Sequence, residues 1–371
     1  MEAERTPNAG LTPRAAVNRL VPYSPGKPIA ETKREFGLTD VIKLGSNENP
    51  LGPSPKAVQA MQCALAELHL YPDGAAFSLK EALAAHCGVP SECIAIGNGS
   101  DELIHYLGIA YLRTGDNIVQ GSPTFVRYES AAVLNEANCI SVPLKDLTHD
   151  VDAIADALND RTRLVFLANP CNPTGTMNTK AEVERLIDRL PPQALLVLDE
   201  AYAEYVTSPD YPNSLDYVKA GKPVIVLKTF SKIYGIAGLR VGYGLARPDI
   251  IRAVEQVREP FNVNTLAQVG ALAALSDTEH LERSRANNTA GRRALESAFT
   301  AMGLTYAPSQ GNFIFVNIGT DCRPVYQMLL SKGVIVRTGD IFGLPTYLRV
   351  TIGTPAENAR FLAELSAALI G

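Results

Sequence analysis

Short apolar runs, separated by stretches of helical periodicity, constrain the fold of this 371-residue chain more than any other feature. The runs occupy residues 93–96, 117–120, 163–168, 195–198, 224–227 and 241–245. A run that is apolar throughout, rather than at alternate positions, is typical of a strand buried on both faces. Helical patterns lie between many of the runs, for example at residues 181–190 and 249–257. This alternation predicts an α/β fold with a mainly parallel sheet flanked by helices.

The pattern changes after residue 261, where long helical stretches at 266–275 and 281–302 precede further short apolar runs. We interpret this part as a smaller α+β domain. The first 45 residues are rich in proline and glycine, and proline removes an N–H donor, so they predict an extended arm. The predicted units are an arm that packs near the small domain and a dimer partner (1–45), a large domain (46–262) and a small C-terminal domain (263–371).

Local signals predict where helices begin and end in the N-terminal third. Ser54 followed by Pro55 is a helix start, because serine caps free N–H groups and proline suits the first helical position. Ser78 with Glu81 three residues later fits a capping box, which predicts a second helix start. Gly88 predicts the end of that second helix.

Charge and composition argue against several classes of protein. The formal net charge of −5 is unfavourable for binding nucleic acid or an anionic membrane, which both need a basic surface. No stretch approaches the ~18 apolar residues of a membrane span, and the N-terminus lacks the apolar segment of a secretory signal. The five histidines and six cysteines share no metal-ligand spacing, so we expect no metal site. We therefore expect a cytoplasmic protein that binds small molecules.

The loop from Gly97 to Glu102 follows a predicted strand and opens a predicted helix. The free N–H groups at Ser100 and Asp101, together with the positive end of the helix dipole, suit a phosphate. The third glycine of a dinucleotide fingerprint is absent, so a dinucleotide site is weakly supported. A tight strand-to-helix turn without a ligand is the alternative.

Three more motifs follow predicted strands, at the edge where α/β sheets bind ligands. Asn172 lies in a loop with two Asn-Pro steps, for which a merely rigid loop is the alternative. Asp199 ends an apolar run, so it needs a cationic partner if buried, unless it caps a helix. Lys232 follows Ser231 in a loop where burial would lower its pKa and favour Schiff-base chemistry. Arg240 is placed to meet a phosphate, although lone lysines and arginines in loops are usually solvated.

In this order, the motifs GSDE, NPCNPTG, DEAY and SK…GLR resemble the fold type I aminotransferases that use pyridoxal 5'-phosphate (PLP). Among these, the chain resembles the histidinol-phosphate aminotransferase family over nearly its whole length. Further matching segments are VPYSPGKP in the arm, SNENPLGPSP from Ser46, REPFNVN from Arg258, GNF from Gly311 and LRVTIG from Leu348. The resemblance implies the fold of a type I PLP-transferase and a homodimer with shared active sites.

The resemblance also implies a role for each matching residue. Lys232 would be the Schiff-base lysine and proton shuttle, and Asp199 the partner of the cofactor's pyridine nitrogen. Asn172 and Tyr202 would contact the phenolic oxygen of the ring, and Phe125 takes the place of a ring-stacking tyrosine in many members. The phosphate would be held by Ser100, Asp101, Thr229, Ser231, Arg240 and, across a dimer interface, Tyr71.

The implied reaction, a step of histidine biosynthesis, converts histidinol phosphate and 2-oxoglutarate into imidazole acetol phosphate and glutamate. Arg337 and Arg349 would bind the substrate anion, because arginine offers fork-shaped, charge-assisted donors to phosphate or carboxylate. Tyr23 would cap the substrate from the other subunit, with Asn47 and Asn312 lining the pocket.

Rival functions of other classes stay open at this stage. An aromatic amino acid aminotransferase for phenylalanine or tyrosine would use the same arginines, and a PLP lyase such as a threonine-phosphate decarboxylase shares the fold. A regulatory protein without turnover is disfavoured, because it would be expected to lose Lys232, Asp199 or Arg240, and all three are present.

Overall fold

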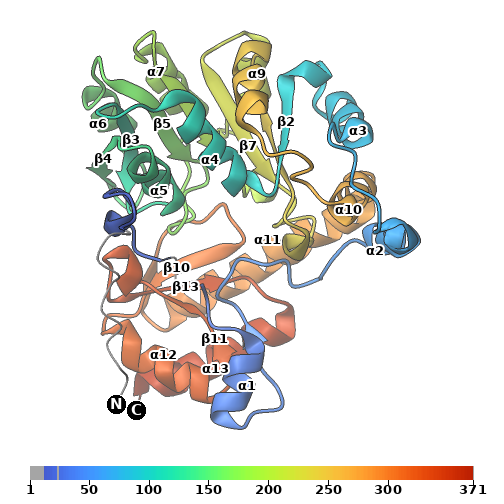
Figure 1. Ribbon diagram of the computed structural model, residues 1–371. Helices are drawn as coiled ribbons and strands as arrows, with labels where there is room; N and C mark the ends of the chain where they lie inside the picture. Colours follow the sequence, from blue (N-terminus) through green and yellow to red (C-terminus); the bar gives the residue numbers. More distant parts are fainter. Residues whose placement is uncertain (1–11, 23–24, 371) are drawn as a thin grey trace.

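The computed structural model describes residues 12–22 and 25–370, so Tyr23 lies outside the described residues. The described chain builds two main sheets, one of seven strands and one of four. In Figure 1 the seven-stranded sheet with its helices forms the upper part, and the four-stranded sheet forms the lower part. The segment that includes α1 (Ile29–Phe36) lies beside the lower part, although it comes from the other end of the sequence.

The seven-stranded sheet is mixed but mainly parallel. Its strands, in order across the sheet, are β2 (Ile94–Gly97), β8 (Gly242–Leu245), β7 (Val224–Thr229), β6 (Leu195–Asp199), β5 (Thr162–Ala168), β3 (Asn117–Ser122) and β4 (Asn138–Pro143). The strands from β7 to β4 run parallel, and β8 is antiparallel to both neighbours. The predicted α/β fold with a mainly parallel sheet is confirmed. Edge strand β4 escaped prediction because most of its side chains are exposed or half-buried, so it is not continuously apolar.

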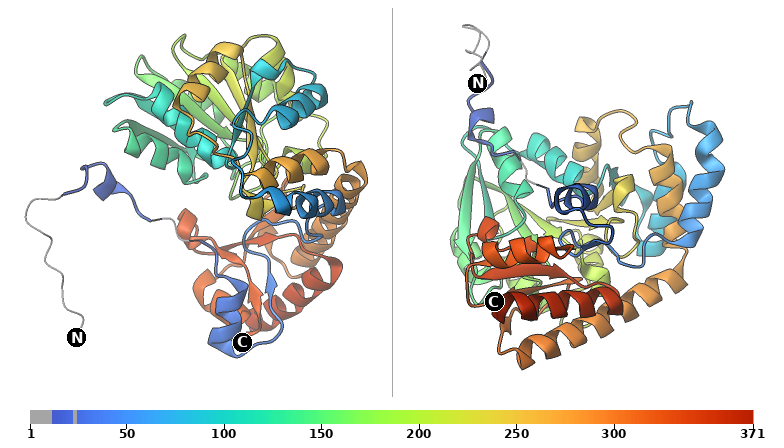
Figure 2. Two further views of the ribbon diagram at one scale, coloured as in Figure 1. Left: turned by 45° about the vertical axis from the view of Figure 1, so that its right-hand side comes forward. Right: turned by 90° about the horizontal axis from the view of Figure 1, so that it is seen from below.

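Helices cover both faces of this sheet, as strands that are apolar on both sides require. One buried core packs the sheet against α4 (Ser100–Tyr111), α5 (Arg127–Leu134) and α9 (Pro248–Val257). The core on the other face involves α3 (Phe77–Cys87), α6 (Val151–Asp156), α7 (Lys180–Asp188), α8 (Ser214–Lys219) and α10 (Thr265–Leu275). The two views in Figure 2 show these helical layers on either side of the strands. Neither sheet face of this part is therefore left for solvent.

The four-stranded sheet is antiparallel and has its own apolar core. Its strands are β12 (Arg337–Thr338), β13 (Tyr347–Thr351), β10 (Phe313–Asn317) and β9 (Thr305–Tyr306). It packs against α11 (Thr278–Ala301), α12 (Cys322–Ser331) and α13 (Pro355–Ile370). A separate parallel pair joins β1 (Ile42–Lys43) to β11 (Val334–Ile335), which ties the N-terminal segment to this C-terminal part. How the chain divides into domains stays a prediction.

The helix ends in the N-terminal third agree with the sequence in two places and differ in one. Helix α2 (Pro55–Ala64) begins after Ser54, whose Oγ accepts the N–H of Ala57, and Gly88 ends α3 in the left-handed region at φ 63°. The capping box predicted at Ser78 is wrong, because α3 already begins at Phe77. The carboxylate of Asp73 instead accepts the N–H of Phe77, so a residue four positions earlier does the capping.

Candidate active site

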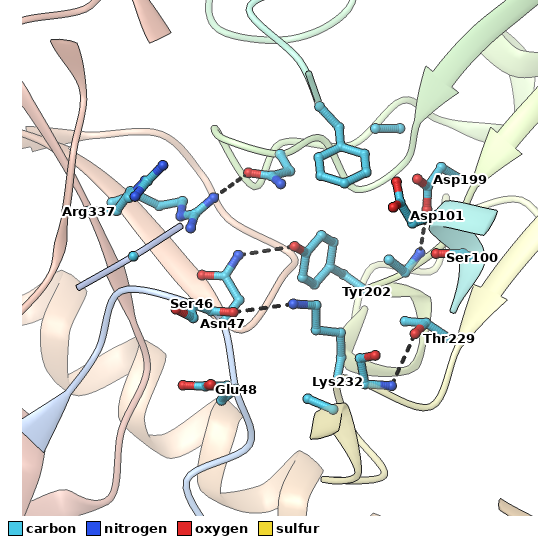
Figure 3. A pocket seen from close by; sticks show the side chains of 18 of the residues that line it. Ser46, Asn47, Glu48, Ser100, Asp101, Asp199, Tyr202, Thr229, Lys232 and Arg337 are labelled. Carbon is cyan, nitrogen blue, oxygen red and sulfur yellow. Dashed lines mark hydrogen bonds between the residues drawn. The ribbon is translucent and has the colours of Figure 1, made fainter. Parts of the chain in front are cut away.

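A cavity of ≈ 530 Å³ lies between the carboxyl ends of the parallel strands and the four-stranded sheet (Figure 3). Its walls come from residues that end or follow β3, β5, β6 and β7, from β12 and β13, and from the segment at 45–48. Of the predicted site residues, the cavity brings together Asn47, Ser100, Asp101, Phe125, Asn172, Asp199, Tyr202, Thr229, Ser231, Lys232, Arg240, Arg337 and Arg349. Segments far apart in the sequence thus converge on one site.

The N-terminal end of α4 forms one end of the cavity and is built to receive an anion. Gly99 precedes the helix at φ 83°, and no side chain caps the free N–H groups there. Nη1 of Arg240 lies 3.4 Å from Oγ of Ser231, and the N–H of Ser231 donates to Oγ1 of Thr229 at 3.1 Å. A Cβ on Gly99 would lie 2.6 Å from Nη2 of Arg240, so any larger residue would displace the guanidinium. Helix dipole, hydroxyls and guanidinium together suit a phosphate group.

Asp199 ends β6 with its carboxylate buried at the base of the cavity. Oδ2 accepts a hydrogen bond from the hydroxyl of Tyr128 at 2.7 Å, and Oδ1 accepts the N–H of Ala201 at 3.2 Å. Burial raises the pKa of Asp199, although these hydrogen bonds and Lys232 oppose the rise. A carboxylate held in this way is suited to a cationic partner such as a protonated ring nitrogen.

Tyr128 is a site residue that the sequence reasoning missed. Its ring stacks on Phe166 at 4.5 Å between centroids and meets Phe125 edge-on at 5.6 Å. Burial and the neighbouring Asp199 raise its pKa well above the usual range, so it stays a hydrogen-bond donor. The available signal was its place on α5, one turn after Phe125, but which face of that helix meets Asp199 depends on tertiary packing.

Lys232 extends into the cavity beside Tyr202, as Figure 3 shows. Its Nζ donates to the carbonyl of Ser46 at 3.3 Å and lies 5.5 Å from the centre of the Tyr202 ring. Burial lowers the pKa of Lys232 to about 8, and the cations Arg349 and Arg240 act in the same direction. Because this pKa is well below the usual value, about a tenth of the amine is unprotonated and nucleophilic at pH 7, far more than for an exposed lysine.

The loop that carries Lys232 is held in place by residues 46–53, which have the sequence SNENPLGP. Nδ2 of Asn49 donates to the carbonyl of Ile233 at 2.7 Å and to Oγ of Ser284 at 2.9 Å. The backbone of Gly52 approaches Gly235 closely. A Cβ added to Gly235 would lie 2.0 Å from the carbonyl oxygen of Gly52. The lysine is therefore placed by packing between two distant segments rather than by its own loop alone.

The opposite wall of the cavity carries the two predicted anion-binding arginines. Arg349 is only 7% exposed, and its guanidinium donates to Oδ1 of Asn172 at 2.5 Å and to the carbonyl of Gly45 at 3.0 Å. The guanidinium also lies 5.5 Å from the centre of the Phe313 ring. These contacts fix Arg349 at the cavity wall with its charge directed to the side where a substrate would bind.

Two predicted polar residues act as a pair beside Tyr202. Nδ2 of Asn47 donates to the hydroxyl of Tyr202 at 3.0 Å. Asn312 does not line the cavity, and its Nδ2 instead donates to the carbonyl of Asn47 at 3.0 Å. The structure therefore places Asn312 behind Asn47, one contact further from the site than the sequence prediction had it.

Tyr71 lies apart from the cavity, 82% exposed and stacked on Phe261 at 4.8 Å between ring centroids. Its predicted role depends on a second subunit. Within residues 12–22 and 25–370, no group of three or more His, Cys, Asp or Glu side chains could hold a metal ion. In the same part of the chain, no helix is both long and apolar enough to cross a membrane.

The site residues fit a flat, phosphate-bearing ring that reacts with an amine. One end of the cavity offers the anion-binding start of α4, the base offers the buried carboxylate of Asp199, and the side offers Nζ of Lys232. Phe125 supplies an aromatic face among the lining residues, but it lacks the hydroxyl of a tyrosine. This set of groups matches PLP: its phosphate, its ring nitrogen and its aldehyde.

Comparison with known proteins agrees with a PLP-binding site. A family model described as aminotransferase class I and II matches residues 39–365. Histidinol-phosphate aminotransferase of Moorella thermoacetica is 56% identical over 353 residues, which cover 95% of this chain and 92% of that protein. The protein of the same name from Akkermansia muciniphila is 48% identical over 356 residues, covering 95% and 97% of the two chains.

A solved structure agrees with the sequence relatives. The crystal structure of histidinol-phosphate aminotransferase from Sinorhizobium meliloti, in complex with pyridoxal-5'-phosphate, matches this fold with a TM-score of 0.89 at 28% identity. The match covers 96% of this chain and 97% of the other. The similarity therefore extends over both sheets.

Proposed function

This chain belongs to the histidinol-phosphate aminotransferase family, within aminotransferase classes I and II, and from that premise we propose its reaction. It binds PLP and transfers the amino group of histidinol phosphate to 2-oxoglutarate, which gives imidazole acetol phosphate and glutamate. The observation that carries the proposal is the placement of Lys232, Asp199 and the start of α4 around one cavity. When bound there, PLP supplies an electron sink for the carbon that carries the amine.

Residues of the chain supply binding and orientation. Asp199 is the partner of the ring nitrogen, Phe125 packs on the ring, and Asn172 and Tyr202 contact the phenolic oxygen. The phosphate is held by Ser100, Asp101, Thr229, Ser231 and Arg240. This assignment is supported by the buried carboxylate at the base of the cavity and by the uncapped helix start at its end.

Lys232 carries the proton in this proposal. Its Nζ would hold the cofactor in the resting enzyme and, when free, would accept a proton from the carbon that bears the donor's amino group. A pKa of about 8 for Lys232 suits both duties, because the amine is neutral often enough to react and basic enough to take a proton. The ring of Tyr202 lies beside Nζ, with its centre 5.5 Å away.

Arg337 and Arg349 bind the anionic end of each substrate, and Asn47, supported by Asn312, lines the pocket beside them. Histidinol phosphate carries a phosphate and glutamate carries two carboxylates, so the same arginines serve both halves of the reaction. Tyr23, outside the described residues, is proposed to close over the substrate from the second subunit.

A second candidate function is supported by a neighbouring cavity of ≈ 410 Å³. It shares Phe125, Asn172, Arg337 and Arg349 with the first cavity, so the two are adjoining chambers. Its remaining lining includes the apolar residues Leu20, Val21, Pro22, Val126, Val133, Ile341 and Phe342. An apolar chamber of this kind also suits the ring of phenylalanine or tyrosine, so an aromatic amino acid aminotransferase is the alternative.

The quaternary structure and location are also proposed. Tyr71 stacks on Phe261, and both are exposed, as are Leu65, Leu68, Leu70 and Phe77 from the same stretch of sequence as Tyr71. An exposed apolar surface of this kind favours a protein partner, and a homodimer with shared active sites would cover it. We further propose a cytoplasmic enzyme, with the arm, large domain and small domain divided as the sequence predicts.

A direct test compares kcat/KM for histidinol phosphate, phenylalanine and tyrosine, each with 2-oxoglutarate as acceptor. The proposal predicts the highest value for histidinol phosphate. Equal or higher values for the aromatic amino acids would replace it with the alternative. No transamination of any of the three donors, in protein that holds PLP, would leave a lyase as the better assignment.

A further inference from the structure

Three largely buried charged side chains, Glu200, Glu204 and Lys228, form a cluster behind the strand ends that carry the site. Nζ of Lys228 lies 3.1 Å from Oε2 of Glu200 and 3.2 Å from Oε1 of Glu204. Their side chains are 5%, 12% and 14% exposed for Glu200, Glu204 and Lys228 respectively. None of the three is among the described residues that line the cavity, so the reaction does not use them directly.

The carboxyl end of β6 and the carboxyl end of β7 each contribute one residue to the site and a neighbouring residue to the triad. Asp199 and Glu200 are consecutive, and so are Lys228 and Thr229. Because successive side chains of a strand point to opposite faces, Lys228 points away from the cavity that Thr229 lines. The N–H of Glu200 donates to the carbonyl of Leu227 at 2.9 Å, which continues the strand pairing as far as the triad.

Glu204 links a third site residue, Tyr202, to the triad. It lies in the short 3-10 helix η4 (Ala203–Tyr205), which begins directly after Tyr202. Its carbonyl accepts a hydrogen bond from Nε of Arg285 on α11 at 2.9 Å. On the other side, the hydroxyl of Ser214 on α8 donates to Oε1 of Glu200. The triad therefore joins β6, β7, η4 and two helices at one point.

The charge balance of the triad depends on each of its three members. Burial acts to lower the pKa of Lys228, but Glu204 and Glu200 more than offset that effect, so its pKa lies well above the usual value and it stays charged. Replacing a buried ion pair by apolar residues often costs little stability, whereas removing one partner leaves an uncompensated charge. Stability alone thus does not account for two acids and a lysine at this place.

We propose that the Glu200–Lys228–Glu204 triad is a positioning device for the cofactor site. It clamps the ends of β6 and β7 and the turn η4, so that Asp199, Thr229 and Tyr202 face the cavity at a fixed spacing. The inference rests on the proposed cofactor roles of these last three residues. The triad members act through their neighbours and are positioning residues, not catalytic ones.

The most informative variant is Glu204→Met, because it leaves Lys228 and Glu200 as a neutral pair and is expected to fold. The dissociation constant of PLP from the refilled apoprotein should rise about tenfold, since residues in direct contact are energetically coupled. The visible circular dichroism of bound PLP should change as the ring shifts. Glu204→Gln, whose amide oxygen still accepts from Lys228, should restore most of the affinity and the dichroism.

A matched control is Arg185→Met, which breaks the exposed ion pair with Asp152 at 3.2 Å and should leave PLP binding unchanged. Lys228→Met provides a second test wherever it folds, and the two Glu204 variants decide the question if it does not. Wild-type affinity and dichroism in Glu204→Met overturn the inference, even if its melting temperature falls. Asp199→Ala is measured in parallel: if it binds PLP normally, the site assignment fails, and if it alone loses affinity, only the positioning role fails.

Discussion

Arg337 on β12 and Arg349 on β13 are direct partners across an antiparallel strand pair, and both side chains line the cavity. Residues opposite each other in such a pair point to the same face of the sheet, and like charges placed there repel one another. An anion bound between the two guanidinium groups would relieve this repulsion. The register of β12 against β13 therefore concentrates positive charge at one end of the site.

Arg337→Ala should lower kcat/KM for histidinol phosphate by roughly ten- to a hundredfold, the effect of losing one charge-assisted hydrogen bond of about 1.5–3 kcal/mol. Phenylalanine, whose ring would occupy that end, should lose less. Steady-state kinetics with both donors measures the difference. Arg323→Ala, which removes an exposed arginine on α12, is the control. Equal and small losses for both donors would instead identify Arg337 as a solvated strand-end residue.

Lys232→Ala should abolish transamination and the covalent linkage to PLP that borohydride traps in the wild-type enzyme. The reason is that Nζ of Lys232 reaches into the cavity opposite the buried Asp199. Peptide mapping after reduction identifies the labelled lysine. Labelling of any other lysine at full occupancy would contradict the central assignment.

The rate at which the apoprotein forms this linkage should rise with pH through a midpoint at about 8, because the neutral amine of Lys232 is the reactive form. Burial is the main cause of the low pKa, and the positive charge of Arg349 contributes to it. Arg349→Leu should therefore move the midpoint to higher pH. A midpoint that moves down, or does not move, would contradict the expected electrostatic effect of Arg349 on the lysine.

Inactive Lys232→Ala subunits mixed with inactive Tyr71→Ala subunits should regain part of the activity. In a dimer with shared sites, one of the two sites would then combine an intact Lys232 with an intact Tyr71. The exposed position of Tyr71, stacked on Phe261, motivates this test. Full activity of a monomer, shown by sedimentation at assay concentration, would rule the shared site out.

Acid should destabilise the protein partly through His149, which is 3% exposed. Burial lowers the pKa of His149 to about 4, whereas an unfolded histidine has a pKa of about 6.5. Between these two pKa values the unfolded state therefore binds more protons than the folded state. The stability that neutral His149 contributes above pH 6.5 is lost as the pH falls towards 4. The loss is on the order of 3 kcal/mol. His149→Gln should flatten this part of the stability curve in urea unfolding, and an unchanged slope would contradict the role of His149.

The apolar pattern of the sequence determined the fold class and the edge of the sheet where the site lies, while many of the other cavity residues were predicted only from the family resemblance. The continuous apolar runs required strands covered on both faces, and every one of them became a strand of the seven-stranded sheet. Because the carboxyl ends of neighbouring parallel strands meet at one edge, Asn172, Asp199 and Lys232 were bound to come together once the sheet formed. These features follow from local pattern and chain order alone.

Tertiary structure decided what local pattern leaves open. Tyr128 reaches Asp199 only because α5 presents that face to β6, and Arg337 meets Arg349 only through the register of two short strands. Asn312 lies behind Asn47, and Asp73 rather than Ser78 caps α3, because each position depends on how segments pack. The sequence gives the type of each side chain, but contacts between residues far apart along the chain set its partners, its burial and its pKa. The ion pairs that join Lys228 to Glu200 and Glu204 are an example.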